Sequence, residues 1–241
     1  MLAIILLTLL AVSTAEDRIY NGKEAEPDLN NVVYLEASLL CTGTIISEHY
    51  ILTAAHCLEP STKSVKAITP DVHRNLPLFK EMKVAPPFFE ADQWIVHPDY
   101  KDITTGNDIA LIRVPTPMTI PPVPLAANYS HPKDDWLRVA GYGNTNYQVF
   151  NASTSNWTSF ESPKMLMERK DGRFYQVGVN VHGFTSEFFS RLSSWKLPSQ
   201  SPSAIASLST DVSYYCPWIE ETTGGEVKCQ TFKSTPIVPK F

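Results

Sequence analysis

The run Leu52-Thr-Ala-Ala-His-Cys57 is the most informative stretch of this chain, and two other segments belong with it. Cys41-Thr-Gly-Thr-Ile-Ile-Ser47 precedes it, and Asn107-Asp-Ile-Ala-Leu-Ile-Arg-Val114 follows it farther along the chain. The β-branched residues near the end of Cys41–Ser47 are typical of a strand. The apolar residues of Asn107–Val114, from Ile109 onward, predict a buried strand. One histidine and one aspartate therefore stand beside predicted strands.

Composition narrows the class of protein. The 241 residues suffice for one large domain or two small ones, and 43% hydrophobic with 19% charged residues is an ordinary globular balance. Nineteen prolines against ten glycines favour a β protein with many rigid loops over a helical bundle. Because the net charge is −5 and no basic stripe is present, nucleic acid is not expected as a partner.

Short apolar runs separated by polar, proline-containing turns predict further strands. Asn31–Glu36 is rich in β-branched residues, His49–Thr53 is a second such run, and Trp94–Val96 is interpreted as a buried strand. Val114–Leu125 carries five prolines and cannot be a central strand. Residues 192–210 are rich in serine and proline, which predicts a long mobile loop. Repeated short strands of this kind indicate a β-barrel or a β-sandwich.

The N-terminal region predicts a secretion signal. Leu2–Val12 is an apolar run of eleven residues, too short to span a bilayer, and the small residues Ser13-Thr-Ala15 suit cleavage after Ala15. We expect residues 1–15 to be a signal peptide and the mature protein to be secreted and extracellular, with no membrane partner. Surface glycans are expected at three sequons: Asn128-Tyr-Ser, Asn151-Ala-Ser and Asn156-Trp-Thr.

In a secreted protein, the four cysteines are expected to form two disulfides, and four cysteines allow three pairings. The most local choice joins Cys41 to Cys57 and Cys216 to Cys229. Zinc binding is the competing interpretation, but it needs ligands clustered at metal spacing, and Cys57 has only His56 beside it. We therefore expect disulfides and no metal site.

The three segments quoted above resemble the histidine and aspartate segments of the chymotrypsin/trypsin family of serine proteases. The resemblance implies an all-β fold of two antiparallel six-stranded β-barrels with a short C-terminal helix. It places the protease domain at residues 19–241, with the first barrel at about 19–120 and a curtailed second barrel at about 121–241. It also implies the disulfide between Cys41 and Cys57.

The segment Asp211–Ile219 resembles the helix near the C-terminus of that family. Pro217 leaves two alternatives: the helix begins near Cys216 with Pro217 in its first turn, or it kinks there. In a helix, four residues of this segment would share one apolar face: Val212, Tyr215, Cys216 and Ile219.

Arg18-Ile-Tyr-Asn-Gly22 resembles the activation site of the family, where cleavage after a basic residue frees a new isoleucine amine. The propeptide would then be residues 16–18, and the new amine would belong to Ile19. In the family this amine pairs with the aspartate before the nucleophile, which orders the substrate pocket. The alternative is that Arg18 is merely an exposed residue near the terminus.

His56 and Asp108 match the general base and the orienting acid of the family. In that chemistry a hydroxyl attacks a carbonyl carbon, an imidazole takes the hydroxyl proton, and a carboxylate fixes the imidazole tautomer. The alternatives are a structural or surface histidine, and an aspartate in a turn or at a strand edge. The residues that flank both positions favour the catalytic interpretation, although sequence spacing alone does not bring the two side chains together.

The third signature of the family, Gly-Asp-Ser-Gly-Gly-Pro around the nucleophile, occurs nowhere in the 241 residues. It should lie between Gly143 and Phe174. If Pro163 matches the proline of the motif, Thr158-Ser-Phe-Glu-Ser-Pro163 replaces it and Phe160 takes the place of the nucleophile. The lost glycines would disrupt the oxyanion hole as well. A shifted alignment leaves four weak candidates for the nucleophile: Ser153, Ser155, Ser159 and Ser162.

These features support two main hypotheses of function. The first is a non-catalytic trypsin-like protein that binds a protein partner as a decoy or a cofactor. The second is an active serine endopeptidase that acts on proteins or peptides, through an unrecognised serine or through a fuller gene product with the missing motif between Gly143 and Gly172. A third hypothesis is unstable folding, since deleted barrel strands would expose edges and core. A monomer without a cofactor is expected.

Overall fold

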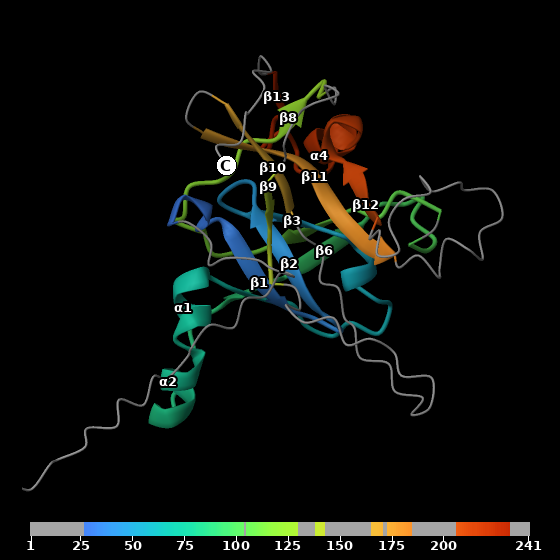
Figure 1. Ribbon diagram of the computed structural model, residues 1–241. Helices are drawn as coiled ribbons and strands as arrows, with labels where there is room; N and C mark the ends of the chain where they lie inside the picture. The colour runs from blue at the N-terminus through green and yellow to red at the C-terminus, as the bar shows by residue number, and fades with distance from the viewer. Residues whose placement is uncertain are drawn as a thin grey trace, which may run out of the picture.

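The computed structural model shows a mostly β protein built on two antiparallel sheets (Figure 1). Within the part that the structure describes, no helix has the length and apolar character needed to cross a membrane. That part comprises residues 27–103, 105–129, 138–142, 165–170, 173–184 and 206–231.

The larger sheet consists of β1 (Val32–Glu36), β2 (Leu40–Ile45), β3 (Tyr50–Thr53), β4 (Lys66–Ile68), β5 (Phe89–Glu90), β6 (Gln93–Val96) and β7 (Ala110–Arg113). The sheet is curled, and its order is β5-β4-β1-β2-β3-β7-β6 (Figure 1). In the register, Leu52 of β3 pairs with Thr44 on one side and Leu111 on the other. Every residue of β3 is buried, which explains why its sequence does not alternate between apolar and polar residues.

The smaller sheet consists of β9 (Arg138–Ala140), β10 (Met165–Lys170), β11 (Arg173–Phe184) and β12 (Ala206–Asp211), in the order β12-β11-β10-β9. Strands β10 and β11 form a hairpin in which Lys170 pairs with Arg173. A short parallel pair joins β8 (Ala126–Ala127) to β13 (Gln230–Thr231).

One hydrophobic core connects the two sheets. Ile51 and Leu111 of the larger sheet are fully buried, and Val179 of β11 belongs to the same cluster of packed side chains. Val212 and Ile219, which follow the smaller sheet, complete this cluster from the C-terminal side. The loops at the junction of the sheets are therefore anchored from both sides.

The C-terminal helical segment consists of η3 (Val212–Tyr215) and α4 (Cys216–Thr222). Pro217 lies in the first turn of α4, where its missing N–H removes no helical hydrogen bond. The first alternative for this proline is therefore correct, and the helix begins at Cys216. The predicted apolar face is confirmed, because its four residues are buried: Val212, Tyr215, Cys216 and Ile219.

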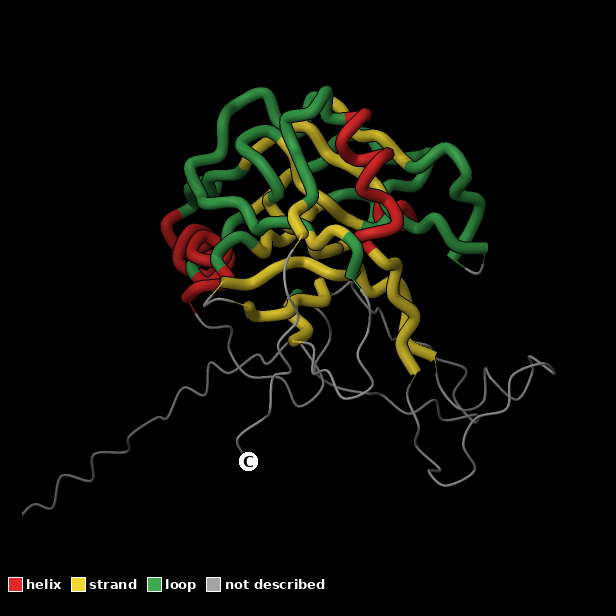
Figure 2. The backbone as a smooth tube through the Cα atoms, turned by 90° about the horizontal axis from the view of Figure 1, so that it is seen from above, coloured by secondary structure: helices red, strands yellow, loops and turns green. Residues whose placement is uncertain are grey.

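Two further helices, α1 (Pro70–Arg74) and α2 (Leu76–Met82), lie between β4 and β5 and were not predicted. They extend from the end of the molecule opposite α4 (Figure 1). Seen from above, the helices lie outside the strands (Figure 2). The short turns η1 (Pro27–Leu29) and η2 (Ala55–Cys57) complete the helical elements of the described residues.

The structure confirms the mostly β fold with its short C-terminal helix, whereas two six-stranded barrels remain a prediction. The proline-rich stretch Val114–Leu125 contains no strand, as expected. Two predictions were wrong. Trp94–Val96 is a strand but is only half-buried, because β6 lies at the edge of its sheet. Residues 206–210, taken as part of a mobile loop, form most of β12, because pairing with β11 organises their backbone.

Candidate active site

The topology of the larger sheet brings His56 and Asp108 to one place. His56 lies in η2, directly after β3, and Asp108 lies directly before β7. Strands β3 and β7 are antiparallel neighbours, with Thr53 paired to Ala110. The end of β3 and the start of β7 therefore meet at the same edge, which places two residues 52 positions apart in contact.

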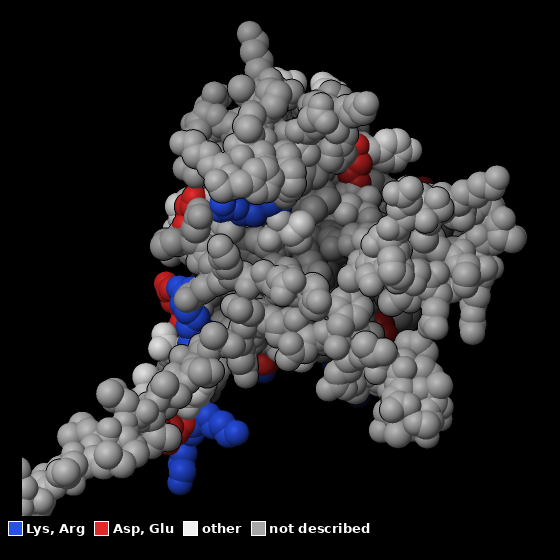
Figure 3. Space-filling view, in the orientation of Figure 1, with Lys and Arg blue, Asp and Glu red and all other residues white. Residues whose placement is uncertain are grey.

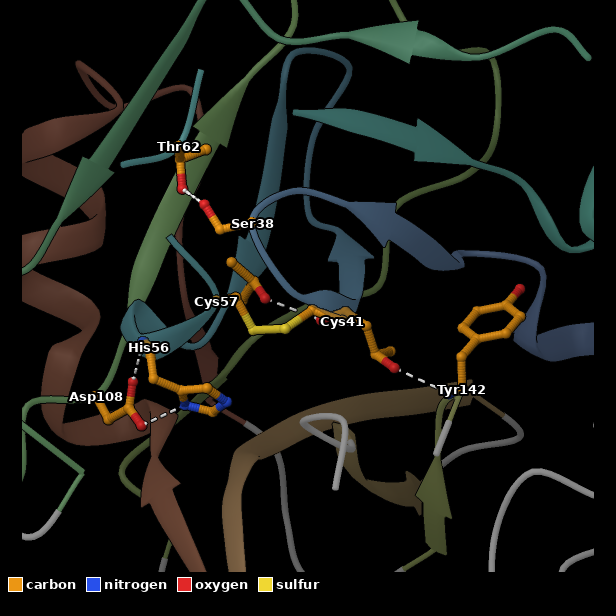
Figure 4. Close-up of a disulfide and its surroundings, with 9 residues drawn as sticks. Ser38, Cys41, His56, Cys57, Thr62, Asp108 and Tyr142 are labelled. Carbon is orange, nitrogen blue, oxygen red and sulfur yellow. Dashed lines mark hydrogen bonds and ion pairs between the residues drawn. A yellow bond between two sulfur atoms is a disulfide. The ribbon is translucent and has the colours of Figure 1, made fainter. Parts of the chain in front are cut away.

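The side chains of His56 and Asp108 form a hydrogen-bonded pair (Figure 4). The Nδ1 atom of His56 lies 2.7 Å from Oδ2 of Asp108. The backbone N–H of His56 donates to Oδ1 of the same carboxylate at 2.8 Å. Both oxygens of Asp108 thus hold one residue, and this double contact fixes the position and the orientation of the imidazole.

Burial divides the pair into a hidden carboxylate and an accessible imidazole. The side chain of Asp108 is 1% exposed, whereas that of His56 is 15% exposed. A carboxylate only accepts hydrogen bonds, so Nδ1 of His56 carries the proton in this contact. In the neutral imidazole, Nε2 then carries the lone pair, and this atom faces away from Asp108 (Figure 4). This arrangement can take a proton from a group placed beside Nε2.

Several residues that the sequence reasoning missed support Asp108. Asn107 adopts a left-handed backbone conformation with φ 58°, which turns the chain just before the carboxylate. The hydroxyl of Tyr215 donates to Oδ1 of Asn107 at 2.9 Å, and the hydroxyl of Thr210 donates to the backbone oxygen of Asp108 at 3.2 Å. Tyr215 and Thr210 lie more than 100 positions away, so no local sequence pattern marks these contacts.

Two tyrosines near Asp108 have raised pKa values. Burial raises the pKa of Tyr100 to about 12, and the negative charges of Asp108 and Asp102 act in the same direction. Burial also raises the pKa of Tyr215, while a backbone contact from Asn107 partly opposes this shift. Both phenols therefore remain neutral to a higher pH than an ordinary tyrosine does.

The structure confirms both disulfides. Cys41 and Cys57 are joined, with Cα atoms 6.1 Å apart, so β2 is tied to the turn that carries His56 (Figure 4). Cys216 and Cys229 are also joined and tie the start of α4 to the segment before β13. The side chains of Cys41, His56 and Cys57 lie within 4.8 Å of one another, a spacing that a metal ion needs. Because both sulfurs belong to a disulfide, they are not available as thiolate ligands.

Of the other predicted site residues outside the cysteines, the structure describes only Asn128. Asn128 is exposed and has φ 53°, a conformation that asparagine tolerates better than most residues. The remaining residues lie outside the described part of the chain: Arg18, Ile19, Asn151, Ser153, Ser155, Asn156, Ser159 and Ser162.

Comparison with known proteins gives the family. Residues 19–183 match the family model described as Trypsin. Trypsin V-A of Rattus norvegicus is 34% identical over 107 residues, which cover 44% of this chain and 40% of that protein. Trypsin-1 of Salmo salar is 29% identical over 150 residues, covering 60% and 58% respectively. Duodenase-1 of Bos taurus is 27% identical over 184 residues, covering 72% and 69%.

The chain thus spans about half the length of the two trypsins it matches. The matched region includes the segments of His56 and Asp108, the Cys41–Cys57 disulfide and both described sheets as far as β11. The chain therefore belongs to the trypsin family of serine proteases.

Proposed function

We propose that this chain is a non-catalytic member of the trypsin family that binds a protein or peptide partner without cleaving it. One observation carries the proposal. The hydrogen-bonded pair of His56 and Asp108 is present, while the motif Gly-Asp-Ser-Gly-Gly-Pro, which would supply the nucleophile, is absent from the sequence. An imidazole and a carboxylate alone cannot form the acyl-enzyme on which this chemistry depends.

The replacement of the motif affects more than the nucleophile. With Pro163 aligned to its proline, Phe160 has no hydroxyl, and Ser159 replaces the aspartate that would receive the amine of Ile19. Thr158, Glu161 and Ser162 replace the three glycines, whose backbone flexibility the oxyanion turn requires. Loss of attack, of pocket ordering and of oxyanion binding together favours a binding protein over a slow enzyme.

The wider organisation is part of the same proposal. We propose a signal peptide at residues 1–15, a propeptide at 16–18 and a protease-like domain at 19–241, secreted as a monomer. Its two barrels would span about 19–120 and 121–241, the second shortened. Glycans would be attached at three asparagines: Asn128, Asn151 and Asn156.

The alternative is an active endopeptidase, and the geometry of the pair is the observation that favours it. The imidazole of His56 is oriented by Asp108 and has its Nε2 free, which is the arrangement that activates a hydroxyl. Ser159 or Ser162 would then supply that hydroxyl, or a fuller product of the gene would contain the missing motif.

A hydrolysis assay separates the two proposals. The chain beginning at Ile19 is incubated with peptide esters of arginine, lysine, aromatic and small residues, beside the variant His56→Ala. The proposal expects both proteins to match the uncatalysed rate. Hydrolysis by the parent chain that disappears in His56→Ala would establish the endopeptidase instead. Hydrolysis that survives in the variant would point to a contaminating protease, which a further purification step removes before the assay is read again.

A further inference from the structure

The segment Leu78–Phe88, here called the apolar tip, exposes an unusual share of large apolar side chains. Leu78 is 49% exposed, Met82 52%, Val84 56% and Phe88 39%. They are four of the seven large hydrophobic residues that are exposed in the described part of the chain. Several exposed apolar side chains within one short segment indicate a surface that contacts something else.

The backbone presents these side chains at the end of a projection. Leu78 and Met82 lie four residues apart on α2, so they share one helical face. Lys83, with φ 56° in the left-handed region, ends the helix, and the chain returns through Val84 and Phe88 toward β5. No residue of α2 is buried, and the helix extends away from the sheets (Figure 1). Among the described residues, the tip can therefore meet a flat surface before the two sheets do.

Lysines lie within the apolar tip and beside it. Lys80 and Lys83 are exposed and outnumber the single acidic residue of the segment, Glu81. Lys66 places its Nζ atom 4.6 Å from the ring centroid of Phe88. Basic side chains stand out at this end of the molecule (Figure 3). Glu90 pairs with Lys66 across β4 and β5, so the tip itself carries one excess positive charge, from Lys80 and Lys83 against Glu81. On a chain whose net charge is −5, this local positive charge favours an anionic surface as its counterpart.

We propose that the apolar tip docks on an anionic lipid surface, which revises the expectation, drawn from the sequence, that the protein has no membrane partner. Leu78, Met82 and the following apolar residues would enter the boundary between headgroups and acyl chains, while Lys80 and Lys83 contact lipid phosphates. A lipid surface fits better than a groove on a protein. The apolar residues are divided between a seven-residue helix and an extended segment, so they offer no single helical face for a groove, and a bilayer needs no matching shape. The docking is independent of whether the His56 site cleaves a substrate.

Vesicle sedimentation tests this proposal. Wild-type protein is mixed with vesicles of phosphatidylcholine containing about one third phosphatidylserine, and with vesicles of phosphatidylcholine alone. We expect the protein to sediment with the anionic vesicles, and less so at high salt. The double variant Leu78→Ser/Met82→Ser should lower the partition coefficient by about tenfold or more, because both anchors are lost. Lys80→Gln/Lys83→Gln should weaken binding to anionic vesicles only.

The matched control is Tyr214→Ser, since Tyr214 is 76% exposed on η3 at the opposite end of the molecule. It should bind as wild type does, and circular dichroism confirms that each variant is folded. Equal binding by wild type and the double serine variant, or no binding by wild type to either vesicle, would overturn the proposal. So would self-association without lipid that the double variant abolishes, because the tip would then cover a second copy of the chain.

Discussion

At the scale of single residues, Gly43 in β2 leaves no room for a side chain between its neighbours in the larger sheet. A Cβ atom at this position would lie 2.5 Å from Cγ2 of Ile51 and 2.9 Å from Cδ1 of Leu35. We expect Gly43→Ala to lower the free energy of unfolding by about 1–3 kcal/mol, because a packed core does not accept an extra methyl group without distortion. Urea unfolding measures the change.

A double-mutant cycle checks the cause of that change. The loss on adding Gly43→Ala should be smaller in an Ile51→Ala background, where the shortest of the close contacts is removed. If Gly43→Ala were neutral in the native background, or equally harmful in both, the steric explanation would be wrong.

Tyr100 provides a pH-dependent prediction at the same scale. Its pKa is raised to about 12 by burial and by Asp108 and Asp102, against about 10 in an unfolded chain. The unfolded state therefore loses the phenol proton first. The contribution of Tyr100 to stability is complete below about pH 10 and declines as pH rises toward 12. Unfolding curves at several alkaline pH values should show a steeper loss for wild type than for Tyr100→Phe. Parallel curves for the two proteins would contradict this prediction.

At the scale of elements, one side-chain hydrogen bond connects the C-terminal helical segment to the turn before β7. Tyr215 in η3 donates to Asn107, which precedes Asp108. Tyr215→Phe removes only the hydroxyl and leaves the amide oxygen of Asn107 without this donor. We expect a loss of about 0.5–1.5 kcal/mol in the free energy of unfolding. Tyr214→Phe is the matched control, because its 76% exposed side chain should tolerate the change. Equal stability of the two variants would refute the structural role of this bond.

The elements also show which parts of the fold the sequence could predict. The buried strands β3 and β7 each contain Ile and Leu, so composition and burial agree there. Strand β10 runs Met-Leu-Met-Glu-Arg-Lys, which are residues with good helix propensity, and its pairing with β11 decides its conformation. The serine-rich β12 is likewise organised by its partner strand. Tertiary pairing of this kind leaves no local signal.

The candidate site divides in the same way. His56 and Asp108 could be identified because each lies in a distinctive local segment, and Cys41–Cys57 because the pairing is both local and typical of the family. The hydroxyls of Thr210 and Tyr215 could not be identified. Their contacts depend on how the C-terminal segment packs against the segment before β7. No local sequence pattern distinguishes these two residues from other threonines and tyrosines of the chain.

At the scale of the whole molecule, contacts from two distant parts of the chain fix the His56–Asp108 pair. The disulfide between Cys41 and Cys57 secures the histidine turn, while Thr210 and Tyr215 contact the aspartate segment from the C-terminal side. One core packs the two sheets together. The acid–base pair is therefore built into the fold, and its presence requires no working nucleophile.

The central claim, that the pair stands without a nucleophile, is tested most directly by covalent labelling. An organophosphonate that reacts only with activated serines is incubated with the chain beginning at Ile19 and with the uncut chain, and peptides are mapped by mass spectrometry. We predict no stoichiometric modification of any serine in either form, because neither the attacking hydroxyl nor the oxyanion turn is in place. Stoichiometric labelling of one serine, such as Ser159 or Ser162, that is abolished by His56→Ala would contradict the claim.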